Sequence, residues 1–162
     1  MHKVFLSIGG NLGNKKLNFD KVYFHIEKGL GAILERSSVY ETPPWGFHCK
    51  ENFWNQVLFV ETKLEPEDLL TGIGEIESRF GRKREPGRYM SREMDIDILY
   101  FDDILTDTER LKIPHPLIHQ RLFVLVPLAE IAPGFIHPLL GKTSRQLLAD
   151  CKDDSDIRRI TF

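Results

Sequence analysis

The hydrophobic and polar positions of the first thirty residues change from one periodicity to another. Residues 2–8 are rich in β-branched and aromatic side chains, as is typical of a strand, and Gly9-Gly10-Asn11 follows as a turn signal. From about residue 14 to residue 28 the apolar positions recur every three or four residues, which predicts a helix with one buried face. The members of that stripe are Phe19, Val22, Tyr23, Ile26 and Leu30. Gly29 and Gly31 supply its stop signal.

The middle of the chain repeats this alternation of patterns. Residues 33–42 and 53–64 predict two strands, separated by a rigid, proline-containing turn. Pro66 opens a second amphipathic helix that Gly81 ends, and a strand follows at residues 95–101. The order β-α-β-β-α-β is that of the split βαβ, or ferredoxin-like, arrangement. It predicts an α+β fold whose antiparallel sheet is covered on one face by two helices.

Beyond residue 101 the pattern adds short elements to this unit. We expect an extended stretch at residues 111–114, a helix near 122–131 and a further helix near 144–151. The chain has 162 residues, which suits one domain with a substantial core. We therefore expect a single domain spanning residues 1–162 with C-terminal additions.

Composition and charge narrow the class of protein. Hydrophobic residues make up 41% and charged residues 28%, and the net charge is −2, so nothing in the overall charge indicates nucleic acid or a membrane as a partner. Cys49 and Cys151 lack CxxC spacing, which argues against a disulfide framework or a zinc site. Neither a signal peptide nor an apolar run of about 20 residues is present. We expect a cytoplasmic monomer with small-molecule partners.

The clearest candidate for chemistry is Asp95-Ile96-Asp97-Ile98-Leu99. Successive side chains of a strand point to opposite faces, so Asp95 and Asp97 share one face, and Ile96 and Ile98 share the other. Two carboxylates about 6.5 Å apart repel each other, and Mg²⁺, which prefers carboxylate and phosphate oxygens, resolves that conflict. The alternative is a solvated strand edge that carries the same pattern.

A basic segment lies directly before this strand. Residues 79–93 contain six basic and two acidic side chains, a local net charge of +4. Arginine forks suit phosphate oxygens, so this segment could close over a triphosphate. The alternatives are a solvated run of charges and a nucleic-acid patch.

An aromatic and amide set could recognise a flat heterocycle. Phe53 and Asn55 share one strand face, and Phe123 could supply an opposing ring, although a phenylalanine is more often a core residue. His115 and Arg121 flank a proline-containing turn; Arg121 could reach phosphate, and His115 could be an ordinary loop residue. The turn at residues 9–14 matches neither GxGxxG nor GxxxxGK[ST], so we interpret it as a tight turn.

Seven segments in this order resemble the 6-hydroxymethyl-7,8-dihydropterin pyrophosphokinases of folate biosynthesis. They are Leu6-Ser7-Ile8-Gly9-Gly10-Asn11-Leu12-Gly13, Tyr40-Glu41-Thr42-Pro43-Pro44, Phe53-Trp54-Asn55, Gly81-Arg82-Lys83-Arg84, Arg92-Glu93-Met94-Asp95-Ile96-Asp97-Ile98, Ile113-Pro114-His115-Pro116 and Arg121-Leu122-Phe123-Val124-Leu125-Val126-Pro127-Leu128. The resemblance covers essentially the whole chain. It implies a Mg²⁺-dependent 2-amino-4-hydroxy-6-hydroxymethyldihydropteridine diphosphokinase, which transfers pyrophosphate from ATP to the pterin hydroxymethyl group and releases AMP.

The resemblance also implies the role of each site residue. The pterin would lie between Phe53 and Phe123, with its edge read by Asn55 and by Thr42, Pro43, Pro44, Trp45 and Gly46. Asp95 and Asp97 would hold two Mg²⁺ ions and, with Arg82 and Arg92, form the catalytic set. The residues implied near ATP are Glu77, Arg84, Arg92, Ile98, Arg110, Leu111, His115 and Arg121.

Three positions depart from the pattern of that family. Phe53 stands where tyrosine is common, which retains stacking and removes a hydroxyl contact. Gly74 and Tyr89 stand where glutamine and tryptophan are common, which leaves details of nucleotide contact and loop closure open.

Mechanistically, we expect the pterin oxygen to attack the β-phosphorus of ATP in line, with catalysis mostly from positioning and charge neutralisation. Asp97 could help to deprotonate the hydroxyl group, but no dedicated base is assigned. Two rival hypotheses are a ferredoxin-like module that binds RNA through its sheet, and another metal-dependent phosphotransferase or nucleotidyltransferase that uses the same aspartates.

Overall fold

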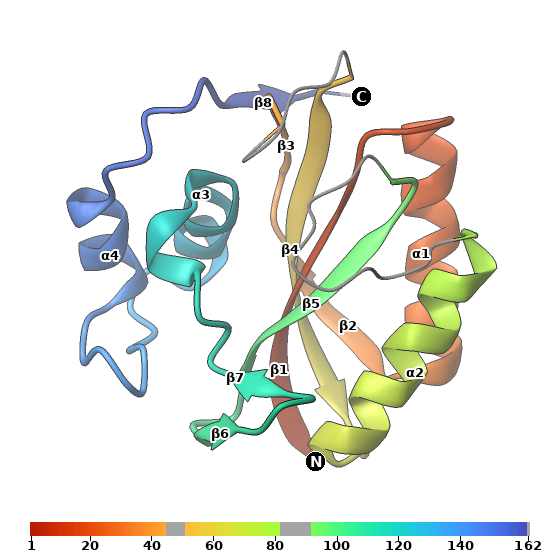
Figure 1. The fold of residues 1–162 in the computed structure, drawn as a ribbon, viewed down its shortest axis with the longest axis horizontal. Helices are drawn as coiled ribbons and strands as arrows, with labels where there is room; N and C mark the ends of the chain where they lie inside the picture. Colours follow the sequence, from red (N-terminus) through yellow and green to blue (C-terminus); the bar gives the residue numbers. More distant parts are fainter. Residues whose placement is uncertain (45–50, 82–91, 162) are drawn as a thin grey trace.

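The computed structural model describes residues 1–44, 51–81 and 92–161. An antiparallel sheet forms the central layer, with α1 and α2 on one face and α3 and α4 on the other (Figure 1). The elements of the first half are β1 (His2–Gly10), α1 (Lys15–Gly29), β2 (Ala32–Arg36), β3 (Val39–Thr42), β4 (Phe53–Thr62) and α2 (Pro66–Arg79). Those of the second half are β5 (Asp95–Phe101), β6 (Thr106–Asp107), β7 (Lys112–Ile113), the 3-10 turn η1 (Ile118–Gln120), α3 (Leu122–Ile131), α4 (Ser144–Asp150) and β8 (Arg158–Ile160).

The sheet has the strand order β5-β1-β4-β3-β8, and β2 pairs with the second half of β4. Neighbouring strands in this sheet are antiparallel, which confirms the predicted split βαβ arrangement with additions after it. The C-terminal strand β8 extends the edge beside β3, and the sequence pattern did not predict it. No helix in the described part of the chain is long and apolar enough to cross a membrane.

The strand predicted at residues 33–42 is divided in two at Ser37 and Ser38. Ser37 is buried, and its N–H donates to the carbonyl oxygen of Val57 at 2.9 Å. Its Oγ accepts from the Val57 N–H at 3.0 Å, and its carbonyl accepts from Nε2 of Gln56 at 2.6 Å. These bonds replace the ladder at the break, so β2 and β3 both pair with β4 but in separate registers.

Local signals explain where the first two helices begin and end. Asn14 caps α1, because its Oδ1 accepts from the Leu17 N–H at 3.1 Å. Pro66 occupies the first turn of α2, where its missing N–H has no helical partner to lose. Past the end of α2, Gly81 has a φ of 73°, the left-handed conformation that commonly ends a helix.

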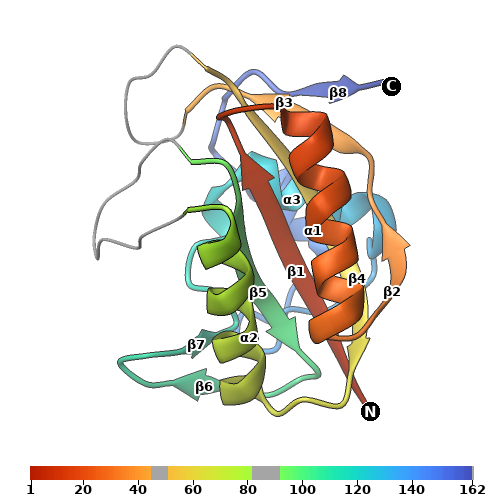
Figure 2. The same cartoon turned by 90° about the vertical axis from the view of Figure 1, so that its right-hand side faces the viewer.

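Two apolar cores lie on opposite faces of the sheet. Even-numbered residues of β1, such as Leu6 and Ile8, pack with α1 and α2, whereas Phe5 packs with α3 and α4. Figure 2 shows α1 and α2 side by side across the sheet. Ile96 and Ile98 belong to the core beneath these two helices, as predicted. The alternate positions of β5 therefore face the side of the sheet that carries α3.

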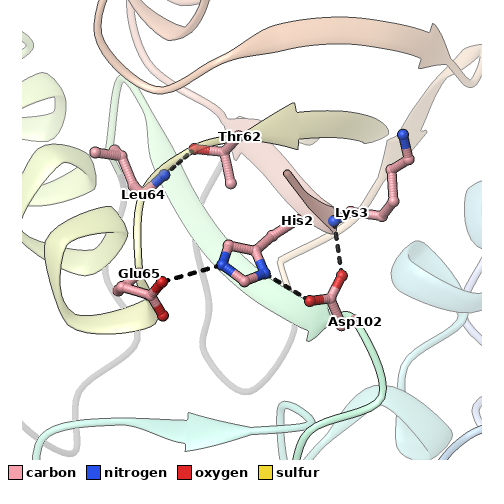
Figure 3. A network of polar contacts seen from close by, with 6 residues as sticks. All are labelled: His2, Lys3, Thr62, Leu64, Glu65 and Asp102. Atoms are coloured by element: carbon pink, nitrogen blue, oxygen red, sulfur yellow. Dashed lines mark hydrogen bonds and ion pairs between the residues drawn. The ribbon is translucent and has the colours of Figure 1, made fainter.

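The end of the sheet that holds the N-terminus is closed by a polar network (Figure 3). His2 Nδ1 lies 2.7 Å from a carboxylate oxygen of Asp102, and His2 Nε2 lies 3.2 Å from one of Glu65. The other oxygen of Asp102 accepts from the Lys3 N–H at 2.8 Å. The network thus joins the start of β1, the end of β5 and the start of α2.

Candidate functional site

A row of residues crosses four adjacent strands at the opposite end of the sheet. Tyr40 of β3 lies opposite Asn55 of β4, Asn55 opposite Gly9 of β1, and Gly9 opposite Asp95 of β5. Residues opposite each other in antiparallel strands point to the same face. This row therefore faces α3. Thr42, Phe53, Ser7 and Asp97 are displaced from it by two residues and share that face.

Except for Tyr40, these residues line one pocket between the sheet and the start of α3. Its lining residues are Ser7, Gly9, Thr42, Pro43, Phe53, Asn55, Arg92, Asp95, Asp97, Arg121 and Phe123. Phe53, Asn55 and Phe123, which the sequence assigned to a flat heterocycle, thus line the same pocket as the magnesium candidates Asp95 and Asp97. Two of the arginines assigned to phosphate, Arg92 and Arg121, line it as well. Of the set assigned to the pterin edge, Pro44 does not line it, and Trp45 and Gly46 lie outside the described residues.

One wall of the pocket is aromatic and carries an amide. Phe53 and Asn55 are nearly buried, with exposed fractions of 7% and 5%. Asn55 Nδ2 donates to Thr42 Oγ1 at 2.8 Å, which fixes the orientation of the amide. This wall can stack a flat ring and hydrogen-bond its edge.

Each aromatic ring of the pocket has a guanidinium group beside it. The guanidinium carbon of Arg92 lies 5.4 Å from the ring centre of Phe53, and that of Arg121 lies 5.3 Å from the ring centre of Phe123. Arg121 is 6% exposed, so its charge is largely withdrawn from water. Both arginines lie where an anion next to a stacked ring would meet them.

The carboxylates Asp95 and Asp97 form the polar side of the same pocket. Arg92 Nε lies 3.6 Å from an Asp95 oxygen, so a cation and an anion lie next to each other in this pocket. In the described residues no cluster holds three or more potential metal ligands. Two carboxylates nevertheless fit Mg²⁺, which is often bound by one or two carboxylates with substrate phosphates and water as the other ligands.

Asp97 also lines a second pocket, on the outer edge of β5. Its lining residues are Leu70, Ile96, Asp97, Ile98, Leu111, Lys112, His115 and Pro116. Three residues assigned to ATP by the resemblance, Ile98, Leu111 and His115, thus lie together. Because β5 is an edge strand, Asp97 stands between the two pockets.

Two other residues assigned to ATP make contacts within the protein. Glu77 is 2% exposed, and its Oε2 accepts from the N–H of Ile96 at 2.9 Å, between the two aspartates in sequence. Arg110 is exposed and binds α2, with Nη2 at 3.2 Å from Thr71 Oγ1. Neither lines a pocket described above, and their nucleotide contacts stay predictions. Arg82 and Arg84 lie outside the described residues.

The glycine-rich turn after β1 has a role that the sequence did not reveal. Asn11 is 1% exposed, and its Oδ1 accepts from the Arg92 N–H at 2.8 Å. Its Nδ2 donates to the carbonyl oxygen of Glu51 at 3.2 Å. The N–H groups of Asn11 and Leu12 both donate to the carbonyl oxygen of Arg92, at 2.8 and 3.1 Å. The turn therefore anchors the backbone of a site arginine.

Glycine is required at Gly9 and Gly10, the last two residues of β1, because atoms of neighbouring segments lie against both positions. A Cβ at Gly10 would lie 2.1 Å from the carbonyl oxygen of Glu93, and one at Gly9 would lie 2.8 Å from Asn55 Oδ1. Either contact is shorter than real Cβ contacts. Tight turning was thus an incomplete explanation for these glycines.

The fold and the site define a class: an enzyme that transfers a phosphate-containing group to a flat, hydrogen-bonding acceptor. A ferredoxin-like sheet brings carboxylates, guanidinium groups and stacking rings to one pocket. The chain belongs to the 7,8-dihydro-6-hydroxymethylpterin-pyrophosphokinase (HPPK) family, whose profile matches residues 5–133. This confirms the resemblance drawn from the seven sequence segments.

Relatives of known name agree with this assignment. A 2-amino-4-hydroxy-6-hydroxymethyldihydropteridine pyrophosphokinase of Aquifex aeolicus is 40% identical over 146 residues, which cover 90% of both chains. The protein of the same name from Methylorubrum extorquens is 38% identical over 161 residues, which cover 99% of both chains. A folic acid synthesis protein of Dictyostelium discoideum is 39% identical over 97% of this chain, which spans only 24% of that longer protein.

Solved structures support the fold. A Plasmodium falciparum HPPK-DHPS structure with pteroate has a TM-score of 0.76 and 18% identity, and the match covers 91% of this chain and 44% of that one. A second HPPK-DHPS structure, in complex with substrates, has a TM-score of 0.73 at 15% identity, with 43% of that chain covered. At this identity the likeness supports the architecture alone.

Proposed function

We propose that this enzyme transfers the pyrophosphoryl group of ATP to the hydroxymethyl oxygen of 6-hydroxymethyl-7,8-dihydropterin, a step of tetrahydrofolate biosynthesis. The observation that carries the proposal is the shared pocket, which is lined by Asp95 and Asp97 together with Phe53, Asn55 and Phe123. A pterin stacked on the rings would thus lie beside the two carboxylates that are proposed to hold the metal and the triphosphate. Family membership and the names of the bacterial relatives support the same reaction.

The aromatic wall is proposed to bind the pterin. Phe53 and Phe123 would stack on its two faces, and the Asn55 amide, oriented by Thr42, would read its edge. Backbone of Pro43, Pro44, Trp45 and Gly46 would complete the edge contacts. Burial of Phe53 and Asn55 keeps water from competing for these bonds.

The second pocket is proposed to bind the nucleotide. Its lining includes Ile98, Leu111 and His115. Asp97 lines both this pocket and the pterin pocket. Arg92 and Arg121 are proposed to bind the triphosphate from the pterin side. The other predicted ATP contacts are Glu77, Arg84 and Arg110, with Arg82 as a further catalytic arginine.

Asp95 and Asp97 are the residues that would hold Mg²⁺, and we propose two ions. When bound, the metal would supply neutralisation of the triphosphate charge and a lower pKa for a bound hydroxyl group. The protein's part is to fix both carboxylates. Glu77 is proposed to help, because its carboxylate accepts from the N–H of Ile96, the residue between the two aspartates.

In the proposed reaction the pterin oxygen bonds to the β-phosphorus, and the bond from that phosphorus to the oxygen bridging the α- and β-phosphates breaks. AMP leaves with that oxygen, and the hydroxyl proton passes to solvent or to Asp97; we assign no dedicated base. The chain contributes by aligning acceptor and triphosphate and by holding positive charge next to the leaving group.

Replacement of Asp97 tests the proposal. Asp97→Ala should abolish turnover while pterin affinity stays within about twofold, because the rings and the amide are untouched. Asp103→Ala, which removes an exposed carboxylate beyond the far end of β5, is the control. Full turnover by Asp97→Ala would contradict the assignment of the polar wall to phosphate transfer.

We further propose that the enzyme works as a cytoplasmic monomer. The composition, with two cysteines in 162 residues, supports a reducing compartment. Light scattering of the purified protein would test the monomer, with a dimer mass as the contrary result.

A further inference from the structure

Helix α3 delivers two side chains to the site and lacks its own N-terminal cap. Arg121 precedes the helix and makes no side-chain capping bond, yet its guanidinium group and the ring of Phe123 line the pterin pocket. The position of both side chains therefore depends on how the first turn of α3 is held. Apolar packing of Val124, Leu125 and Leu128 attaches the helix to the sheet. The hydrophobic driving force is non-directional, so polar contacts can add directional constraints to the orientation of this helix.

A carboxylate from the C-terminal segment caps this helix from a distance. Asp153 Oδ2 accepts from the N–H of Leu122 at 3.0 Å, and Leu122 lies between the two site residues in sequence. Asp153 Oδ1 accepts from the N–H and the hydroxyl group of Ser155, at 2.9 and 2.5 Å, so the carboxylate is itself oriented. A negative charge at this end of a helix is also favoured by the helix dipole.

The other end of α3 has a second polar anchor, Glu130. Its Oε2 accepts from the N–H and the Oγ of Ser38, both at 3.0 Å, and its Oε1 accepts from the hydroxyl group of Tyr40 at 2.6 Å. Tyr40 is the β3 residue opposite Asn55. Glu130 therefore ties the helix to the strand that carries the opposite wall of the pocket, including Thr42.

The hydrogen bonds to both carboxylates also favour their ionised forms. Burial by itself would raise the pKa of Asp153, but the bonds from Ser155 and Leu122 lower it below its usual value. For Glu130, burial again acts to raise the pKa, and the bonds from Tyr40 and Ser38 lower it. Both groups are thus held as carboxylates that accept bonds.

We propose that Asp153 and Glu130 are positioning residues for pyrophosphoryl transfer. From the two ends of α3 they fix Phe123 and Arg121 against the wall formed by Phe53 and Asn55. Neither carboxylate lines the pocket, so both act through the helix. This inference rests on the proposed function, because it concerns the same pterin pocket.

The test compares Asp153→Ala with Asp154→Ala, which removes the neighbouring exposed carboxylate. Pterin affinity is measured by fluorescence titration without ATP, and kcat and KM by AMP formation. Asp153→Ala should weaken pterin binding about fivefold to tenfold and lower kcat, as expected when a cap that orders a binding turn is lost. Asp154→Ala should match the wild type.

A conservative variant separates positioning from general stability. Asp153→Asn keeps an oxygen that can accept from Leu122, and we expect its pterin affinity to lie within about threefold of the wild type. Glu130→Ala should also weaken pterin binding, and urea unfolding shows whether each variant is folded. If Asp153→Ala does not fold, the pterin affinities of Asp153→Asn and Glu130→Ala are compared with that of Asp154→Ala instead.

The outcomes distinguish this inference from the proposed function. A wild-type protein that binds no pterin and forms no AMP would overturn the proposed function. A wild type that does both, with Asp153→Ala and Glu130→Ala equal to Asp154→Ala in pterin affinity and kcat, would overturn the positioning role alone.

Discussion

Gly9 lies at the centre of the site floor, and its replacement by alanine is a sharp perturbation. A methyl group there would lie 2.8 Å from Asn55 Oδ1 and 2.9 Å from the carbonyl oxygen of Trp54. The carbonyl oxygen belongs to the paired backbone of β4 and cannot swing aside. The Asn55 amide would have to retreat by about 0.6 Å to reach an ordinary contact distance of 3.4 Å.

The expected magnitude has two parts. Overfilling a packed position typically destabilises a protein by about 1–3 kcal/mol. A displaced Asn55 amide loses its 2.8 Å bond to Thr42 and its alignment with the pterin edge. A buried polar group left imperfectly paired costs about 1–3 kcal/mol, which corresponds to roughly fivefold to 150-fold weaker pterin binding.

The assay is a fluorescence titration of the pterin alcohol, combined with urea unfolding. Gly74→Ala is the matched control, because Gly74 lies in α2 and a Cβ there would meet nothing within 4 Å. That substitution should leave pterin affinity unchanged and stabilise the protein by about 0.5–1 kcal/mol. If Gly9→Ala binds pterin as tightly as the wild type, the contact geometry of the pocket floor is wrong.

Three other predictions follow from polar contacts around the sheet. Asn11→Ala should lower kcat by at least about tenfold, since the backbone of Arg92 loses its anchor; a change confined to thermal stability would contradict this. Glu77→Ala should lower the free energy of unfolding by about 1–3 kcal/mol more than Glu77→Gln, because the alanine variant leaves the buried N–H of Ile96 unpaired. Equal urea midpoints of the two variants would refute this. Hydrogen bonds to Asp102, and secondly to Glu65, raise the pKa of His2. The stabilisation that His2→Gln removes should therefore be full below pH 6.5 and should fade as the pH rises through the higher pKa of the folded state. Tm values of both proteins, measured from pH 5 to 9, would show the reverse trend if the network in Figure 3 were repulsive.

The sequence pattern predicted the order of elements because burial on one face imposes a period. The stripe of α1 and the alternation of β5 both correspond to buried faces in the structure. The break at Ser37 was not predicted, since the bonds that replace the ladder come from residues twenty positions away. Nor was β8, a three-residue strand whose pairing with β3 depends on the path of the C-terminal segment.

The site was predictable where chemistry is carried by unusual side chains. Asp95 and Asp97 stand out in any strand, and Phe53 and Asn55 share a face by simple alternation. Gly9 and Asn11 were interpreted only as parts of a turn. Their roles follow from the register of β1 against β4 and from contacts with Arg92, which alternation alone does not reveal.

Contacts of charged residues were the least predictable part of the site. The resemblance predicted that Glu77 lies near the nucleotide, and it did not predict the bond that the Glu77 carboxylate accepts from the N–H of Ile96. Asp153 had no sequence signal at all, because its partner Leu122 is 31 residues away. Long-range caps of this kind depend on tertiary structure and leave no local pattern.

In the proposed reaction the pterin oxygen attacks the β-phosphorus of ATP. ³¹P nuclear magnetic resonance of one reaction mixture, with wild-type protein, Mg²⁺, ATP and the pterin alcohol, tests it directly. We expect the α-phosphorus to appear in AMP and the β- and γ-phosphorus atoms to appear together in the pterin diphosphate. Appearance of ADP with a pterin monophosphate, or of AMP and free pyrophosphate without a pterin ester, would contradict it.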